Sequence, residues 1–365
     1  REHFVVDPFS GKGTTSIECQ KLGITNLGIE INPLLEEVGN SSLKWSSSYL
    51  YLFEKYITEV TNLIESNKGN SINSVISNLN TRLPTIHNVF RWWKPEVLKN
   101  LVICREVMLW NKYLPIKNYL WIALTNACLD CANIHRNHPT ITFDDYHHRK
   151  IDVIYEITTN LNIIKADLEN LTSDEISFSE IGHIKRGNSV KDLSSIQDTV
   201  DFVITSPPYP NRYSYIHQTR PQLYFMEILD TAREATELDL EAIGGTWGRA
   251  TSNLKKKLIT IPPDIKPYLS YHKDLKEKSI LMCNYATKYF IDMWKHIKEL
   301  KQIKSKDFSG VYVVGNSRLS GVEIFTESIL GNIFMNEGFT VEKIISFRRR
   351  GGRKKLYESA VCIKG

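Results

Sequence analysis

The N-terminal residues hold the feature that most constrains the fold. A short apolar run, Phe4–Val6, ends in an Asp-Pro pair and is followed by a loop with two glycines. The pattern of Thr14–Leu22 predicts a helix, and Asn26–Glu30 predicts a second strand that stops at an acidic residue. Strand, helix and strand in this order form a β-α-β unit, in which the two strands lie parallel in one sheet. The opening of the chain therefore predicts an α/β fold.

The sequence from 34 to 180 has a different pattern. Apolar residues recur near helical spacing in four stretches, Leu34–Ser66, Glu96–Trp110, Ile116–Cys131 and Arg149–Leu171. Strand patterns return at Gly182–Arg186 and Asp201–Ile204. We therefore expect a doubly wound, Rossmann-like sheet domain formed by 1–33 and 181–365, with 34–180 as a largely helical insertion between strands two and three.

The C-terminal half completes the expected sheet. A stretch that carries glycine and proline, about 210–270, predicts irregular structure. Beyond it the pattern predicts helices at Leu275–Leu300 and Val322–Asn336, and strands at Gly310–Val314, Thr340–Phe347 and Ser359–Ile363.

Composition excludes several classes of protein. The 365 residues carry a formal net charge of +5, with 42% hydrophobic and 24% charged residues, as in a soluble globular protein. No apolar run approaches the roughly 20 residues of a membrane span. Six scattered cysteines are too few for a disulfide scaffold and favour a reducing compartment, so we expect a cytoplasmic protein. The sequence begins at Arg1 rather than Met, and we expect residues to precede it.

The loop Asp7–Thr15 lies where a parallel sheet binds ligands, between a strand and the next helix. Gly11 and Gly13 let the backbone approach a ligand, and the helix N-terminus offers free N–H groups. A nucleotide P-loop needs a glycine five places before Gly-Lys-Ser/Thr, and that pattern is absent because Lys12 is followed by Gly13. A glycine-rich turn without a ligand remains the alternative at this point.

Glu30 favours a ligand over a plain turn. It ends the second strand about 20 residues after the loop, where an acid can bind the two hydroxyls of a ribose. Alone, such a residue would be a solvated strand end. Together with the loop it predicts a nucleoside cofactor.

A second motif, Thr205–Tyr209, directly follows the strand Asp201–Ile204. A Pro-Pro pair is commonly only a turn. Here the two prolines fix the backbone at a strand end of the same sheet, as a carbonyl acceptor requires, and an aromatic residue able to stack on a base comes next.

The two motifs together resemble a known family. Asp-Pro-Phe-x-Gly-x-Gly-Thr-Thr with a downstream Gly-x-Glu resembles the S-adenosylmethionine motif of amino-methyltransferases that act on DNA. Thr-Ser-Pro-Pro-Tyr resembles the catalytic motif of the cytosine-N4 branch, whereas adenine-N6 enzymes more usually carry Asp or Asn in place of Ser206. The resemblance covers the expected sheet and does not extend to 34–180. The upstream Pro-Ala-Lys-Phe-like segment that the family often carries is absent.

The resemblance assigns roles by position. It implies that the methionine part of the cofactor is held by Asp7, Pro8, Phe9, Gly11, Gly13 and Thr14, and that Glu30 binds the ribose. Asn188 matches the adenine-contacting position, where Asp is more usual. The catalytic motif comprises Ser206, Pro207, Pro208 and Tyr209. Near the C-terminus, Arg349, Tyr357 and Glu358-Ser359 resemble the closing strand pair of the family.

The chemistry of an exocyclic amine indicates how the second motif would act. The nitrogen lone pair is delocalised into the ring, so we expect the Ser206 side chain and the Pro207 carbonyl to accept the amine hydrogens while Tyr209 stacks on the base. A base inside a duplex cannot reach such a pocket and must flip out. Cytosine-C5 chemistry is not expected, because it uses a Pro-Cys nucleophile and no cysteine here follows a proline.

Basic residues are candidates for contacts with DNA. Arg212, Tyr213 and Arg220 follow the second motif and could contact phosphate or the flipped base, or simply order a loop. The run 348–355 contains Arg348, Arg349, Arg350 and Arg353, and we expect it to contact phosphates rather than form a solvated hairpin tip.

Other features favour ordinary structure. Cys128 and Cys131 with His135 and His138 have spacings that suit zinc, but the cysteines lie on an apolar helical run, so no metal is expected. His147 and His148 predict a polar loop, and Trp92 and Trp93 predict core packing.

We expect double-stranded DNA as the partner, no membrane, and a cognate restriction endonuclease or defence subunit as a further partner. The alternatives are an adenine-N6 or RNA base-amine methyltransferase and, from another class, a non-catalytic DNA-binding subunit.

Overall fold

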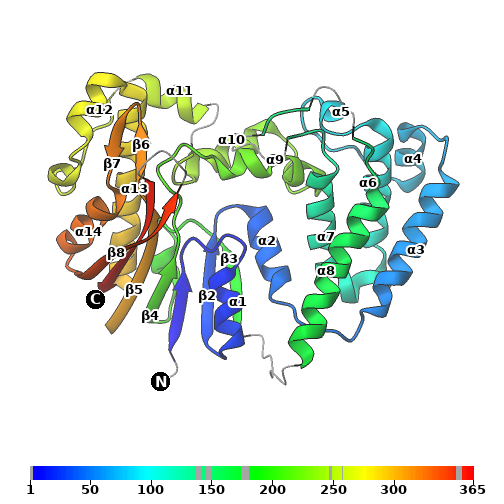
Figure 1. Ribbon diagram of the computed structural model, residues 1–365, viewed down its shortest axis with the longest axis horizontal. Coiled ribbons are helices and arrows are strands. Elements are labelled where there is room, and N and C mark those ends of the chain that lie inside the picture. Colours follow the sequence, from blue (N-terminus) through cyan, green and yellow to red (C-terminus); the bar gives the residue numbers. More distant parts are fainter. Residues whose placement is uncertain are drawn as a thin grey trace. The chain divides into compact units, whose positions relative to one another are not determined.

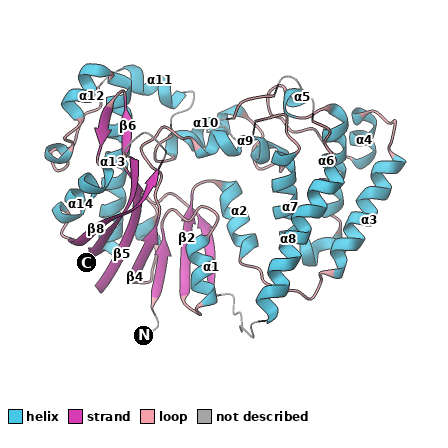
Figure 2. Cartoon of the chain, viewed as in Figure 1, coloured by secondary structure: helices cyan, strands magenta, loops and turns pink. Residues whose placement is uncertain are grey.

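The computed structural model describes residues 3–135, 141–144, 149–173, 181–245, 249–256, 258–350 and 356–365. The chain divides into two compact units (Figure 1). The sheet unit comprises Arg1–Gly39, Ser179–His217 and Thr236–Gly365. The helical unit comprises Asn40–Phe178 and Gln218–Ala235. The strands gather in the sheet unit, as the secondary-structure colours show (Figure 2).

The described residues of the sheet unit form a seven-stranded sheet. Its strands are β1 Phe4–Asp7, β2 Thr25–Glu30, β3 Gly182–Arg186, β4 Val200–Thr205, β5 Lys304–Gly315, β8 Thr340–Arg350 and β9 Leu356–Lys364. They lie in the order β3-β2-β1-β4-β5-β9-β8. The first five are parallel, and β9 runs antiparallel between β5 and β8. The predicted doubly wound, Rossmann-like sheet with its insertion between strands two and three is confirmed.

The direction of winding reverses between β1 and β4. These two strands are neighbours, with Val5 opposite Phe202 and Val6 opposite Val203. From β1 the sheet continues through β2 to β3, and from β4 it continues to β5. The carboxyl ends of strands at such a reversal form the crevice in which α/β sheets bind ligands. Asp7 and Thr205 end the two strands at this point.

Helices cover the sheet. They are α1 Thr14–Lys21, α2 Pro33–Ser42, α11 Arg249–Lys256, α12 His272–Lys278, α13 Ile280–Ile303 and α14 Thr326–Asn336. Two short 3-10 helices, η2 Leu193–Ser195 and η3 Lys266–Tyr268, accompany them. Helix α1 packs on β1, β2 and β3, and α14 packs on β5, β8 and β9 (Figure 1). Helix α13 contributes Phe290, Met293 and Ile297 to the apolar core, all without exposed surface. Burial of this stripe stabilises the sheet.

Two expectations for the C-terminal half were wrong. The stretch 210–270 is not irregular, because it contains α9 Tyr215–Phe225, α10 Ala232–Glu241 and α11. Pro221 lies inside α9, where a proline normally indicates a break. The predicted helix Val322–Asn336 begins later, since Val322–Ile324 forms β7, which pairs with β6 Ser317–Leu319. Alternating burial along β7 is the two-residue period of a strand.

The described regular elements of the helical unit are helices. They are α3 Tyr51–Ser66, α4 Ile72–Leu79, α5 Val89–Trp92, α6 Pro95–Met108, η1 Asn111–Ile116, α7 Lys117–Asp130, α8 Val153–Ser173 and the C-terminal part of α9. Helices α6 and α7 form its centre, since they bury residues on almost every side. Trp92 and Trp93 are buried, as predicted, and the Trp93 indole donates to the Cys128 carbonyl at 2.8 Å.

A buried arginine explains why residues 218–235 belong to the helical unit. Arg105 of α6 is almost fully buried, and its guanidinium donates to the Phe225 carbonyl at 2.7 Å and the Thr81 hydroxyl at 2.9 Å. The same group pairs with Glu227 at 3.0 Å and Glu106 at 2.9 Å. A buried charge requires such partners. Residues 218–235 are thereby fastened to α6, beyond the expected insertion boundary.

No helix in the described ranges combines the length and apolar character that a membrane span needs. Within the same ranges no three or more His, Cys, Asp or Glu side chains gather as a metal site would require. Cys128 and Cys131 are buried free thiols. His138, His147 and His148 lie outside the described residues.

Candidate functional site

A cavity of about 570 Å³ lies at the carboxyl ends of the parallel strands in the sheet unit. Its lining includes Asp7, Pro8, Phe9, Ser10, Gly11, Lys12, Thr14 and Thr15 from the first loop, Ile29 to Asn32 around the end of β2, Gly187, Asn188 and Ser189 after β3, and Ile204, Thr205, Ser206 and Pro208 around the end of β4. This volume is typical of a small-molecule site. Both sequence motifs therefore border one cavity.

The first loop depends on glycine at Gly13. This residue caps α1 with φ at +85°, in the left-handed region that favours glycine. A Cβ there would also lie 2.8 Å from Ile184 Cδ1 on β3. The tight turn brings the N-terminus of α1, with its free N–H groups, to the border of the cavity.

Asp7 joins the two motifs. Its carboxylate is 5% exposed and accepts hydrogen bonds from the Phe9 amide at 3.1 Å and the Thr205 hydroxyl at 2.6 Å. Burial raises the pKa of this carboxyl above its ordinary value, partly offset by these donors. A second link crosses the same strands, because the Thr15 hydroxyl donates to the Ile204 carbonyl at 3.2 Å. The loop after β1 is thus fastened to the end of β4.

Glu30 is held at the end of β2 by backbone donors. One carboxylate oxygen accepts from the Gly11 amide and the other from the Asn32 amide, both at 2.8 Å. Burial raises the pKa of Glu30 from 4.5 to about 7, against the lowering effect of these amides. A carboxylate has about four acceptor positions, so acceptor capacity remains for two hydroxyls. The side chain borders the cavity, where a ribose could use it.

Asn188 borders the same cavity, but its groups have local partners. Its side-chain oxygen accepts from the Val190 amide at 3.0 Å, and its side-chain nitrogen donates to the Glu241 carbonyl at 3.3 Å. Its backbone amide donates to Asp192 at 2.6 Å. The residue therefore shapes the loop after β3 and presents that loop to the cavity.

The second motif is more open than the first. Ser206 is exposed, and it lines the cavity together with Pro208. Its hydroxyl lies 3.4 Å from the hydroxyl of Tyr209, whose ring is partly buried. Pro207 is buried, and neither it nor Tyr209 is among the described residues that line the cavity. Ser206 is therefore the residue that connects the cavity with the aromatic ring.

The loop after the second motif is ordered by its own contacts. Arg212 has φ at +60°, and its amide donates to the Tyr285 hydroxyl at 2.9 Å. The Tyr213 ring packs edge-on against Tyr215 at 5.0 Å. Arg220 belongs to the helical unit, where it lies 5.0 Å from the centre of the Trp92 ring and burial lowers its pKa.

The C-terminal arginines have separate environments on β8. Arg348 forms a two-pronged ion pair with Glu358, at 2.7 and 2.8 Å. Arg350 lies over the Tyr209 ring at 4.9 Å. Arg349 is exposed. None of these three lines the cavity among the described residues, and Arg353 lies outside the described ranges.

His296 of α13 is a site residue that the sequence did not reveal. It has no exposed surface, and its ring contacts Phe9 of the first loop at 4.9 Å. One ring nitrogen lies 3.3 Å from the Ser189 carbonyl and the other 2.8 Å from the Tyr312 hydroxyl. Burial lowers its pKa from 6.5 to about 4, so the ring is neutral at pH 7 and packs against Phe9, which lines the cavity. A single histidine within a long helix gave no signal of this contact.

The residues at the cavity fit a nucleoside cofactor such as S-adenosylmethionine. Ser10 borders the cavity, and its buried hydroxyl has no hydrogen-bond partner within the described ranges. A bound ligand would satisfy such a group, which is costly to leave unpaired. Glu30 offers acceptors for a diol, and α1 offers amides for a carboxylate. Gly28 leaves room for Ser10, since a Cβ there would lie 2.5 Å from its hydroxyl oxygen.

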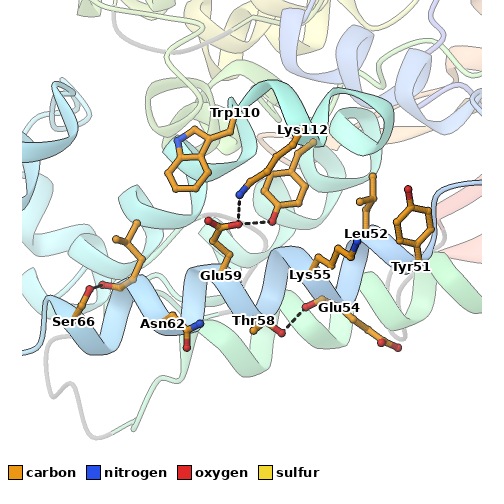
Figure 3. A pocket seen from close by; sticks show the side chains of 12 residues that line it. Tyr51, Leu52, Glu54, Lys55, Thr58, Glu59, Asn62, Ser66, Trp110 and Lys112 are labelled. Carbon is orange, nitrogen blue, oxygen red and sulfur yellow. Dashed lines mark hydrogen bonds and ion pairs between the residues drawn. The ribbon is translucent and has the colours of Figure 1, made fainter.

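A larger hollow of about 990 Å³ lies on the helical unit, formed by α3 and η1 (Figure 3). Within it, Lys112 and the Tyr113 hydroxyl, the latter at 2.9 Å, both bind Glu59 and lower the pKa of that carboxyl. Lys112 also lies 4.8 Å from the centre of the Trp110 ring. Neither sequence motif lines this hollow, so its size does not make it the candidate site.

Known methyltransferases are similar in sequence to this chain over most of its length. The chain is 23% identical over 378 residues to the Type II methyltransferase M.MvaI of Kocuria varians, covering 96% of this chain and 78% of that protein. It is 23% identical over 370 residues to the Type II methyltransferase M.AvaI of a Nostoc species, covering 93% and 74%. No family model and no solved structure matches the chain. Similarity to Type II methyltransferases over almost the whole chain supports a methyltransferase enzyme built on this sheet.

Proposed function

We propose that this chain is an S-adenosylmethionine-dependent DNA methyltransferase that modifies an exocyclic base amine, with cytosine N4 as the favoured target. We further propose that it serves a restriction–modification or related defence system, with a cognate endonuclease as partner. The similarity to Type II methyltransferases supports the reaction class. The Ser-Pro-Pro-Tyr residues that follow Thr205 favour cytosine.

One observation carries the proposal. The hydrogen bond of 2.6 Å between the Thr205 hydroxyl and Asp7 fastens the cofactor-type loop to the catalytic-type motif across neighbouring strands. Both motifs then border the same cavity. Methyl transfer in one step requires the methyl carbon and the amine to meet in line, and such positioning can contribute roughly 7–11 kcal/mol.

The loop after β1 and the end of β2 would bind the cofactor. When bound, S-adenosylmethionine supplies the activated methyl group. Glu30 accepts the ribose hydroxyls, and the Asp7–Thr14 loop with the amides of α1 holds the methionine part. The loop at Asn188 borders the adenine. Buried His296 packs against Phe9 and so supports the Asp7–Thr14 loop.

The end of β4 would bind the target base. The Ser206 hydroxyl and the Pro207 carbonyl accept the two amine hydrogens, which localises the lone pair on nitrogen. Tyr209 stacks on the ring and offsets part of the cost of flipping, by about 1–3 kcal/mol. The rigid Pro207-Pro208 backbone fixes the direction of the carbonyl acceptor.

DNA itself would be bound by basic residues and the helical unit. We propose Arg212, Tyr213, Arg220, Arg348, Arg349 and Arg353 as nucleic-acid contacts, and 34–180 as the target-recognition region. The formal net charge of +5 is compatible with a polyanionic partner.

The test is methyl transfer from labelled cofactor to duplex DNA, followed by hydrolysis to nucleosides. Recovery of N4-methylcytosine supports the full proposal, whereas N6-methyladenine supports the reaction and contradicts the target base. Ser206→Ala and Tyr209→Ala should each lower the rate by about a hundredfold, as misplacement of a reacting group does. Transfer by both variants at the rate of the unmodified protein would remove this site from consideration.

A further inference from the structure

Arg350 lies against the aromatic residue of the catalytic motif. Its guanidinium carbon is 4.9 Å from the centre of the Tyr209 ring, within the distance at which arginine is attracted to a ring face. The guanidinium also donates a hydrogen bond to the Asn316 carbonyl. Arg350 is therefore held over Tyr209 rather than extended into solvent, as an arginine awaiting a phosphate would be.

Gly315, the last residue of β5, makes this contact possible. A Cβ at this position would lie 2.5 Å from the guanidinium carbon of Arg350 and 2.9 Å from Cδ2 of the Tyr209 ring. Both distances are below any ordinary contact, and the neighbours are a ring and a planar guanidinium group. The absence of a side chain at Gly315 gives the room in which the two groups pack.

The backbone that anchors Arg350 is itself fixed. The side-chain oxygen of Asn316 accepts a hydrogen bond from the Tyr357 amide at 2.6 Å, and the Asn316 amide donates to the Tyr357 carbonyl at 3.3 Å. These bonds tie Asn316 to β9. A continuous set of contacts thus runs from β9 through Asn316 and Arg350 to the ring of Tyr209, and from its hydroxyl to Ser206 at 3.4 Å.

We propose that Arg350 is a positioning residue for Tyr209, stacked on its ring so that the exposed part of the ring is presented to the target base beside Ser206. The proposal rests on the proposed function, because it assumes that Tyr209 stacks on a base. It gives Arg350 a role different from that of a phosphate contact. The planar guanidinium suits this role, since it stacks on a ring and donates sideways at the same time.

The experiment measures methyl transfer to plasmid DNA by Arg350→Ala, Arg350→Lys and Tyr209→Ala. It also measures the double variant that combines Arg350→Ala with Tyr209→Ala. Arg350→Ala should lower kcat by about ten- to a hundredfold, because a misplaced ring misplaces the base. The Kd for DNA and its dependence on salt should not change. Arg350→Lys keeps the positive charge but lacks the planar guanidinium group, so it should not restore kcat. The double variant should be no slower than Tyr209→Ala alone.

Arg318 provides a matched control. It lies on β6, and Arg318→Ala removes the same charge without touching Tyr209. Its kcat should equal that of the unmodified protein. A phosphate contact at Arg350 predicts the opposite pattern: weaker DNA binding, a salt slope reduced by about one, and recovery with lysine. That pattern, or additive losses in the double variant, would overturn the proposal.

A second measurement needs no enzyme activity. The free energies of unfolding of Arg350→Ala, Tyr209→Ala and the double variant should be non-additive, since the two groups touch. Gly315→Ala should abolish that coupling by separating them. If the unmodified protein transfers no methyl group but the coupling is present, the proposed function fails and the positioning contact stands. Additive unfolding energies would show that Arg350 does not hold Tyr209.

Discussion

The two sides of the cavity differ in how their polar groups are satisfied. On the β1 and β2 side, Asp7 and Glu30 are 5% and 9% exposed, and each accepts two hydrogen bonds from the protein. On the β4 side, Ser206 is exposed and its recorded neighbour is the Tyr209 hydroxyl at 3.4 Å. The two carboxylates of the first side are held by the protein before any ligand arrives, whereas the exposed Ser206 hydroxyl on the β4 side is left for a ligand.

This difference indicates how the two sides should respond to substitution. Removing a buried acceptor leaves donors unpaired, so changes on the cofactor side should cost stability as well as binding. Changes to an exposed hydroxyl should cost rate and leave stability almost unchanged. A variant of Asp7 or Glu30 that lowered the rate of methyl transfer without lowering stability would therefore contradict this difference between the two sides.

Asp7→Ala should have the largest effect. It leaves the Thr205 hydroxyl and the Phe9 amide without their shared acceptor and removes the link between the two loops. We expect the free energy of unfolding to fall by about 1–3 kcal/mol. Cofactor affinity should fall by at least about tenfold, which corresponds to 1.4 kcal/mol. Urea unfolding and titration calorimetry measure the two quantities.

Asp7→Asn is the matched control for that change. The amide keeps an oxygen that can accept from both donors, so most of the lost stability should return. Equal losses in the two variants would show that charge, rather than the link between the loops, decides the effect.

Glu30 should make cofactor binding depend on pH. Burial raises its pKa from 4.5 to about 7. Its contribution to the stability of the ligand-free protein is therefore fully present below pH 4.5 and lost as the pH rises through about 7. Cofactor affinity should change in the opposite direction, because the ionised carboxylate accepts ribose hydroxyls best. Affinity should rise through pH 7, and binding near that pH should release a proton.

Calorimetry in two buffers of different ionisation enthalpy measures that proton. Glu30→Gln should bind more weakly and show a flat pH profile, since the amide does not titrate. A pH-dependent affinity that persists in this variant would assign the titration to another group, with Asp7 as the nearest candidate because burial raises its pKa too.

The sequence predicted the fold well where local pattern and sheet topology agree. Apolar runs that end in an acid or in Thr-Ser placed β1, β2 and β4, and the rule that parallel strands bind ligands at their carboxyl ends brought the motifs together. The prediction from sequence failed at α9. Proline normally breaks a helix, so the local sequence around Pro221 predicted irregular structure, but contacts with residues distant in sequence outweigh that preference.

Site residues outside the two motifs could not be found in this way. His296 and Gly315 acquire their roles through contacts with residues distant in sequence, Phe9 and Tyr209. The basic run at 348–350 predicted one kind of contact for three residues. In the fold, Arg348 pairs with Glu358, whereas Arg350 packs on a ring. Such differences depend on the bulged pairing of β8 with β9, which composition does not encode.

The smallest effects, and the sharpest form of the comparison, come from two adjacent residues. Thr205→Val keeps the shape of the side chain but removes the hydroxyl that donates to Asp7, and should cost about 1 kcal/mol of stability. Ser206→Ala should change stability by less than about 0.5 kcal/mol, because its hydroxyl is exposed. Urea unfolding and cofactor titration of the two variants distinguish the residue that supports the cofactor loop from the residue that faces the target base. Thr205→Val should weaken cofactor binding and Ser206→Ala should not, since only Thr205 supports the loop that Asp7 begins. If Ser206→Ala destabilised the protein as much as Thr205→Val, the Ser206 hydroxyl would be bound within the protein as firmly as the Thr205 hydroxyl, and the difference between the two sides of the cavity would disappear.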